Sequence, residues 1–162
     1  MLFACLMTVG LIVVTVFIHS EGLHLIGALT RLEAARPRPG ITVLILSVIA
    51  LHLLEILIYA AAYGLADNTL NLGDFTGARE FDYLDYFYFS AGTFTATGFG
   101  DIDVTGSLRL LASIEPINGL ILIAWSGAFT YLAVQRHWES RIKRAEAAAH
   151  RLPSRLSRRK VR

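Results

Sequence analysis

Three long apolar stretches constrain the fold of this chain more than any other feature. They cover residues 1–18, 41–64 and 110–134 of a 162-residue sequence that is 54% hydrophobic and only 17% charged. A run of about 20 apolar residues is long enough to cross a bilayer as a helix. Because this composition is too apolar for a soluble domain of this size, the sequence predicts an all-α membrane protein with three transmembrane helices.

The segments between the apolar stretches set the expected domain boundaries. Pro37 and Pro39 cannot both lie inside a helix, so they indicate a break before the second span. No Lys or Arg precedes Arg31, so we interpret the first apolar stretch as a span rather than as a cleaved secretory signal. The expected parts are an N-terminal transmembrane helix, a connection, a membrane-embedded domain and a basic tail, over residues 1–19, 20–40, 41–134 and 135–162.

Positive charge is concentrated in two of these parts. Of the 15 Lys and Arg residues, three lie in 20–40 and ten in 135–162. The positive-inside rule places both segments in the cytoplasm and the N-terminus outside, in the inner (plasma) membrane. Clustered basic residues beside a membrane bind anionic lipid headgroups. We expect lipid rather than nucleic acid at the end of the tail, namely at Arg155, Arg158, Arg159 and Lys160.

The segment from Thr95 to Asp101, Thr-Ala-Thr-Gly-Phe-Gly-Asp, follows a short aromatic stretch that Asp82 or Asp85 can cap as a helix. Its alternate glycines permit backbone conformations that a Cβ excludes. Such a strand can turn successive carbonyl oxygens toward one axis. Four copies around that axis would stack rings of oxygens able to replace the hydration shell of a cation. Because the sequence contains no internal repeat, four copies require four chains.

At this segment the chain resembles the pore-loop potassium channel family, whose filter reads Thr-Val-Gly-Tyr/Phe-Gly-Asp. Three further segments resemble small bacterial channels of that superfamily that have two pore-forming spans, here preceded by an extra helix: His52-Leu-Leu-Glu55, Asn118 to Ser126, and Gln135-Arg136-His-Trp138. The resemblance implies a homotetrameric channel, not an enzyme, with no cofactor besides permeant K⁺. The implied outer helix, pore helix, filter and inner helix are 41–64, 82–95, 95–101 and 110–134.

The resemblance also assigns roles to residues of the filter. Potassium ions would bind the carbonyl oxygens of the filter, whose members are Thr95, Ala96, Thr97, Gly98, Phe99 and Gly100. Asp101 would brace the filter through a hydrogen bond to Tyr88. Two positions depart from the family pattern: Ala96 replaces a threonine whose hydroxyl binds the innermost ion, and Thr97 replaces a valine that packs behind the filter. In addition, Gly92 stands where some members carry a carboxylate.

The last span offers small and weakly polar residues at helical spacing, as expected for a helix that lines an aqueous pore. Glycine in such a helix can be a bending point, but it also permits close packing of helices. Both interpretations stay open for Gly119 and Gly127. The predicted lining set is Gly119, Ile123, Ser126, Gly127 and Thr130.

His52 and Glu55 lie three residues apart inside the second span and therefore on one helix face. Ionisable residues at this depth are costly and need a partner. The pair is either a proton-sensitive device that modulates gating or a structural hydrogen bond, made within the pair or to the first span; we favour the structural interpretation. We expect His19, with Glu21 and His24, to lie at headgroup level rather than to bind a metal.

Two alternatives to a potassium channel remain. A non-selective cation channel on the same scaffold is favoured by the missing hydroxyl at Ala96. A membrane-embedded regulatory or assembly subunit that does not conduct is disfavoured by the intact Gly98, Gly100 and Asp101.

Overall fold

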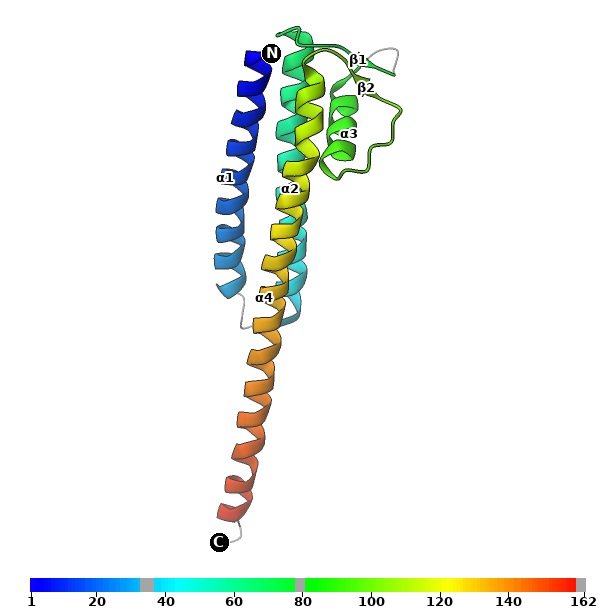
Figure 1. The fold of residues 1–162 in the computed structure, drawn as a ribbon. Helices are drawn as coiled ribbons and strands as arrows, with labels where there is room; N and C mark the ends of the chain where they lie inside the picture. The colour runs from blue at the N-terminus through cyan, green and yellow to red at the C-terminus, as the bar shows by residue number, and fades with distance from the viewer. Residues whose placement is uncertain (33–36, 78–80, 160–162) are drawn as a thin grey trace.

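The structure, a computed structural model, describes residues 1–162 except 33–36, 78–80 and 160–162. In this part the chain forms the helices α1 (Leu2–Leu32), α2 (Pro37–Asn68), α3 (Tyr83–Phe94) and α4 (Leu108–Arg159), and the short strands β1 (Phe75–Thr76) and β2 (Asp103–Val104) (Figure 1). Three of the described helices contain segments long and apolar enough to cross a membrane: Leu2–Leu29, Gly40–Asn68 and Leu108–Arg136. The predicted all-α membrane fold with three spans is confirmed; the two-residue strands were not predicted.

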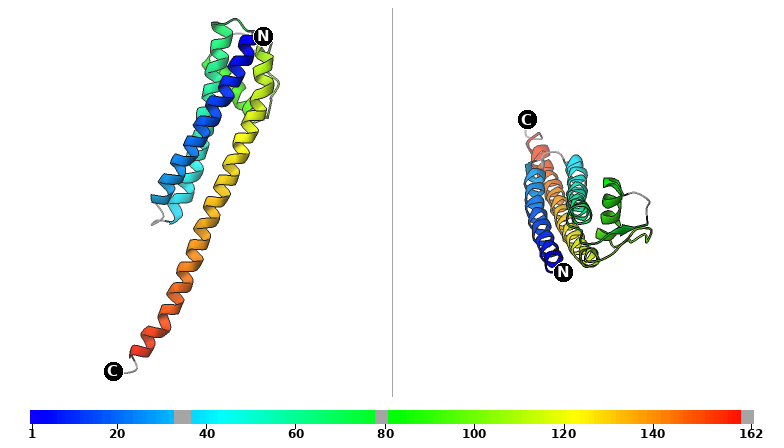
Figure 2. Two further views of the ribbon diagram at one scale, coloured as in Figure 1. Left: turned by 60° about the vertical axis from the view of Figure 1, so that its left-hand side comes forward. Right: turned by 90° about the horizontal axis from the view of Figure 1, so that it is seen from above.

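The three long helices lie side by side, and α3 packs at the end of the bundle where the N-terminus lies (Figures 1 and 2). Helix α4 continues well beyond the opposite end of α1 and α2. The main core joins α2, α3 and α4, with Tyr59, Phe94 and Leu122 all fully buried in it. The short helix α3 is therefore held against the bundle by apolar burial on its inner face.

Helix α1 is longer than predicted. It continues without interruption to Leu32, beyond residue 19, where the predicted N-terminal transmembrane helix ends. Packing explains the difference: Leu23 and Ile26 are buried against Leu44 and Leu51 of α2, and this second apolar cluster holds residues 20–29 in the helix. The predicted connection 20–40 thus shrinks to a few residues around 33–36, which lie outside the described part.

Helix α2 begins at Pro37, four residues before the predicted start at residue 41, so both prolines lie in its first turn rather than in the connection. A proline at the first helical position is favourable because its missing N–H would have no partner there. The helix runs to Asn68, slightly beyond the predicted end at residue 64. Asn68 donates from its side-chain nitrogen to the carbonyl oxygen of Gly64 and to the hydroxyl of Tyr86 on α3.

Two features fix the ends of α3. At its start the Asp82 carboxylate accepts from the backbone N–H groups of Leu84 and Asp85, and the Asp85 carboxylate accepts from the Asp82 N–H, which is a capping box. Outside the helix, β1 pairs antiparallel with β2, with Phe75 opposite Val104 and Thr76 opposite Asp103. This pairing brings the chain before α3 next to the chain after residues 95–101.

Helix α4 extends to Arg159 as a single helix of 52 residues. The span predicted over 110–134 lies within it, and the basic tail continues the same helix past Pro153. Alanine, arginine and lysine favour helix on both sides of Pro153, and the helix continues there although proline is unfavourable in a helix interior. The predicted lipid-binding side chains of Arg155, Arg158, Arg159 and Lys160 lie outside the described residues.

Candidate functional site

The loop after α3 folds back onto the carboxyl end of that helix. The backbone N–H of Thr97 donates to the carbonyl oxygen of Gly92 at 2.8 Å, and Ala96 donates to Thr93 at 2.9 Å. These bonds satisfy carbonyl groups that a helix end otherwise leaves without partners. The start of the predicted filter is therefore fixed by the backbone of the predicted pore helix.

Every second residue of the loop has a left-handed backbone conformation. The φ angle is +56° at Ala96, +51° at Gly98 and +79° at Gly100. Alternation of this kind rotates successive peptide planes so that their carbonyl oxygens can face the same side, which is the arrangement that dehydrates a cation. Glycine adopts the conformation freely, whereas it is unfavourable for alanine. The sequence identified the two glycines but not Ala96.

The hydroxyl groups of the loop bond to each other and to α3. The Thr95 hydroxyl donates to the Ala91 carbonyl oxygen at 2.8 Å, and its oxygen lies 2.9 Å from that of the Thr97 hydroxyl. The Thr97 hydroxyl, which stands where the family usually has a valine, thus has the Thr95 hydroxyl as its hydrogen-bond partner. At Ala96 the loop carries no side-chain oxygen.

Tyr88 of α3 lies against the outer part of the loop. Its hydroxyl donates to the Asp101 carboxylate at 3.0 Å, and its ring stacks on that of Phe99 with centroids 5.4 Å apart. Partial desolvation and then the hydrogen bond to Asp101 raise the pKa of Tyr88 above its ordinary value, which favours the protonated phenol that donates this bond. The expected hydrogen bond is present in the structure. A small cavity between α3 and the loop is lined by Tyr88, Gly92 and Phe99, among others.

The predicted pore-lining residues of α4 fall into two groups, one buried within the chain and one at least partly exposed. Gly119 and Ser126 are buried within the chain, Gly119 against the Phe94 backbone and Ser126 with its hydroxyl 3.3 Å from Nε2 of His19. Both therefore face the other helices rather than a pore. Ile123 and Gly127 lie on an exposed face of the chain, and Thr130 is half-buried.

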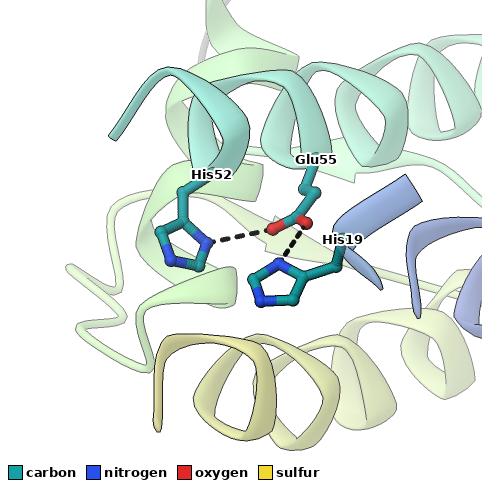
Figure 3. A group of neighbouring side chains, drawn as sticks. All are labelled: His19, His52 and Glu55. Atoms are coloured by element: carbon teal, nitrogen blue, oxygen red, sulfur yellow. Dashed lines mark hydrogen bonds and ion pairs between the residues drawn. The ribbon is translucent and has the colours of Figure 1, made fainter. Parts of the chain in front are cut away.

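The expectation for His19 is wrong. This residue is fully buried between α1, α2 and α4, and its Nδ1 lies 2.7 Å from Oε1 of Glu55. His52 Nδ1 lies 3.0 Å from the other carboxylate oxygen, Oε2. Both imidazole rings face one carboxylate (Figure 3). The His52–Glu55 hydrogen bond and the bond to the first span, which the sequence gave as alternatives, thus occur together.

The sequence missed two further polar contacts inside the bundle. The Glu115 carboxylate accepts from the Tyr63 hydroxyl at 2.6 Å and from the Ser90 hydroxyl at 2.7 Å, which links α4 to α2 and α3. The Asn118 amide donates to the hydroxyls of Thr15 and Tyr59. The available signal was a carboxylate and an amide within a span, since such groups need partners at that depth.

A family model described as "ion channel" matches residues 43–135, which include α3, the loop and the membrane part of α4. The match covers more than half of the chain, and the chain belongs to this ion channel family. With its third long apolar helix, α1, it has the form of a small pore-loop channel with an extra N-terminal helix. No curated protein and no solved structure matches the chain.

Proposed function

We propose that this membrane protein is a potassium-selective channel that conducts K⁺ passively as a homotetramer, with residues 95–100 of four chains as its filter. The observation that carries the proposal is the alternation of left-handed residues at Ala96, Gly98 and Gly100. Carbonyl groups of a single chain cannot surround an ion, and four copies would complete each ring. Residues 95–100 are all exposed in the single chain, which supports an arrangement in which they face an axis between chains.

The helix before the loop supports a site for a cation. The carboxyl end of a helix carries a partial negative charge, and α3 ends at Phe94, directly before the loop. The positive-inside rule supports an orientation in the inner membrane with the filter mouth outside the cell and the C-terminus in the cytoplasm. The basic tail then meets the cytoplasmic lipid surface, where anionic headgroups are its expected partners.

A non-selective cation channel is the second candidate, because Ala96 supplies no hydroxyl for the innermost ion. The test is the reversal potential of the purified protein in planar bilayers with K⁺ on one side and Na⁺ on the other. A value near the potassium equilibrium potential supports the first proposal. A value near zero supports the second, and Ala96→Thr is then expected to shift it toward the potassium value.

Absence of current would favour a subunit that does not conduct. Gly100→Ala serves as the matched control for conduction, because it adds only a methyl group, in open space, at a φ of +79°. We expect it to abolish the current while the protein still folds. A current that persists unchanged in Gly100→Ala would contradict the assignment of the filter.

A further inference from the structure

We propose that His19, His52 and Glu55 form a binding site for a divalent transition-metal cation of the Zn²⁺ type inside the helix bundle. Each residue offers one donor atom, and these atoms all lie within 4.8 Å of one another. Two imidazole nitrogens and one carboxylate oxygen are a donor set that zinc binds with an open fourth position. The site is separate from the filter, and the proposal does not depend on ion conduction.

The two helices bring the three side chains together in different ways. His52 and Glu55 share one face of α2, three residues apart, and α1 supplies His19 from across the interface. Figure 3 shows both rings turned toward the carboxylate. Ligand atoms of a tetrahedral zinc ion, with bonds of about 2.0–2.1 Å, lie roughly 3.3 Å apart. The present separations of 2.7 and 3.0 Å go to different oxygens of the carboxylate, so a shared ion requires these two contacts to open slightly and the three donor atoms, which lie within 4.8 Å of one another, to converge on one point.

The charge of the cluster also favours a cation. Among the residues that the structure describes, Glu55 forms ion pairs with the two histidines and with no Lys or Arg. From α4 the Ser126 hydroxyl and the Trp125 ring face His19, and both are neutral groups. A carboxylate buried inside a membrane bundle is costly unless a positive charge lies beside it. A divalent cation supplies that positive charge directly and is coordinated by the carboxylate and the two imidazoles.

Ser126 supplies the outer contact that orients a metal-bound histidine. When Nδ1 of His19 binds a metal, its proton resides on Nε2, which then donates to a neighbouring acceptor. The Ser126 oxygen lies 3.3 Å from that nitrogen, and a hydroxyl can either donate or accept. The same contact therefore serves the metal-free and metal-bound tautomers. Bound metal would connect α1 directly to α2 and, through Ser126, to α4.

The experiment measures Zn²⁺ binding to the purified full-length chain in detergent, by metal content after gel filtration, and follows Co²⁺ as a spectroscopic substitute. The wild-type chain is expected to bind about one ion, with the visible absorption of tetrahedral Co²⁺. His52→Gln and Glu55→Gln are expected to weaken Zn²⁺ binding at least 100-fold, because loss of outer contacts alone costs about 10–100-fold. The matched control is His24→Gln, since His24 is an exposed histidine of α1 outside the cluster.

A second variant separates metal ligation from a structural hydrogen bond. His52→Cys replaces one zinc ligand by another, so it is expected to retain Zn²⁺ and to add sulfur-to-cobalt charge-transfer bands. A purely structural role predicts no such rescue. The proposal is overturned if the wild-type chain binds no more Zn²⁺ than His52→Gln does. It is also overturned if Glu55→Gln binds Zn²⁺ as tightly as the wild-type chain. In either case the three side chains form a hydrogen-bonded cluster and not a metal site. Zn²⁺ binding is measured without current recordings, so failure of the metal site and failure of the proposed channel function can be distinguished.

Discussion

Gly119 of α4 lies directly against the carbonyl group of Phe94, the last residue of α3, with no room for a side chain between them. This close approach places α4 against the point where α3 ends and the loop 95–101 begins. It favours close packing over bending as the reason for a glycine at this position.

Gly119→Ala is expected to destabilise the protein strongly. A Cβ at this position would overlap the Phe94 carbonyl oxygen, and backbone on both sides would have to shift. Overpacking of this kind costs about 1–3 kcal/mol or more. Gly127→Ala is the matched control in the same helix, because nothing lies within 4 Å of the added methyl group. Denaturant unfolding in detergent measures both variants, and equal loss of stability would contradict the packing argument.

Tyr63→Phe is expected to reduce the free energy of unfolding by about 1–3 kcal/mol, because one oxygen of the buried Glu115 carboxylate loses its partner. Ser90 still donates to the other oxygen. Tyr131→Phe on α4 removes a hydroxyl from a side chain that is 68% exposed and provides the control. An unchanged unfolding free energy for Tyr63→Phe would mean that water replaces the lost hydroxyl.

Tyr88→Phe is expected to loosen the outer part of the filter, because it removes the hydrogen bond to Asp101 and keeps the ring that stacks on Phe99. Amide hydrogen exchange of the segment 98–101 should become faster. Tyr83→Phe, at an exposed tyrosine one turn earlier in α3, should leave that exchange unchanged. Identical exchange in the two variants would exclude a bracing role for Tyr88.

Ala96→Gly is expected to stabilise the loop by roughly 1 kcal/mol, because glycine adopts a φ of +56° without the penalty that a Cβ brings. Ala91→Gly is expected to have the opposite sign, since Ala91 lies within α3 and glycine is unfavourable in a helix by about 1 kcal/mol. Thermal unfolding of both variants measures the difference. A lower melting temperature for Ala96→Gly would indicate that its methyl group makes a packing contact that outweighs the strain.

The sequence predicted those features that depend on neighbouring residues along the chain. Apolar length predicted the three spans, and Asp82 and Asp85 were the two candidates for the cap of α3, where both take part in the capping box. The alternate glycines indicated the backbone of the loop. The left-handed conformation of Ala96 was not predicted, because local propensity disfavours it for alanine. The hydrogen bonds of Ala96 and Thr97 to the end of α3 hold the backbone in this conformation.

Features that depend on contact between distant segments could not be predicted. His19 and Glu55 are 36 positions apart, and their contact requires α1 to continue beyond the polar residues at 20 and 21. The burial of Leu23 and Ile26 against α2 supplies that continuation. Glu115 finds Tyr63 and Ser90 in the same way, through helices whose relative rotation the periodicity of one span does not specify.

The short pairing of β1 with β2 has a mechanical consequence. Because Phe75 lies opposite Val104 and Thr76 opposite Asp103, the chain enters and leaves the segment with α3 and the filter at a single anchor. A displacement of the first residues of α4, which follow β2 closely in the chain, is therefore transmitted to both ends of this segment together. The two ends of the segment that contains residues 95–101 keep their spacing when α4 tilts, because the strand pairing joins them.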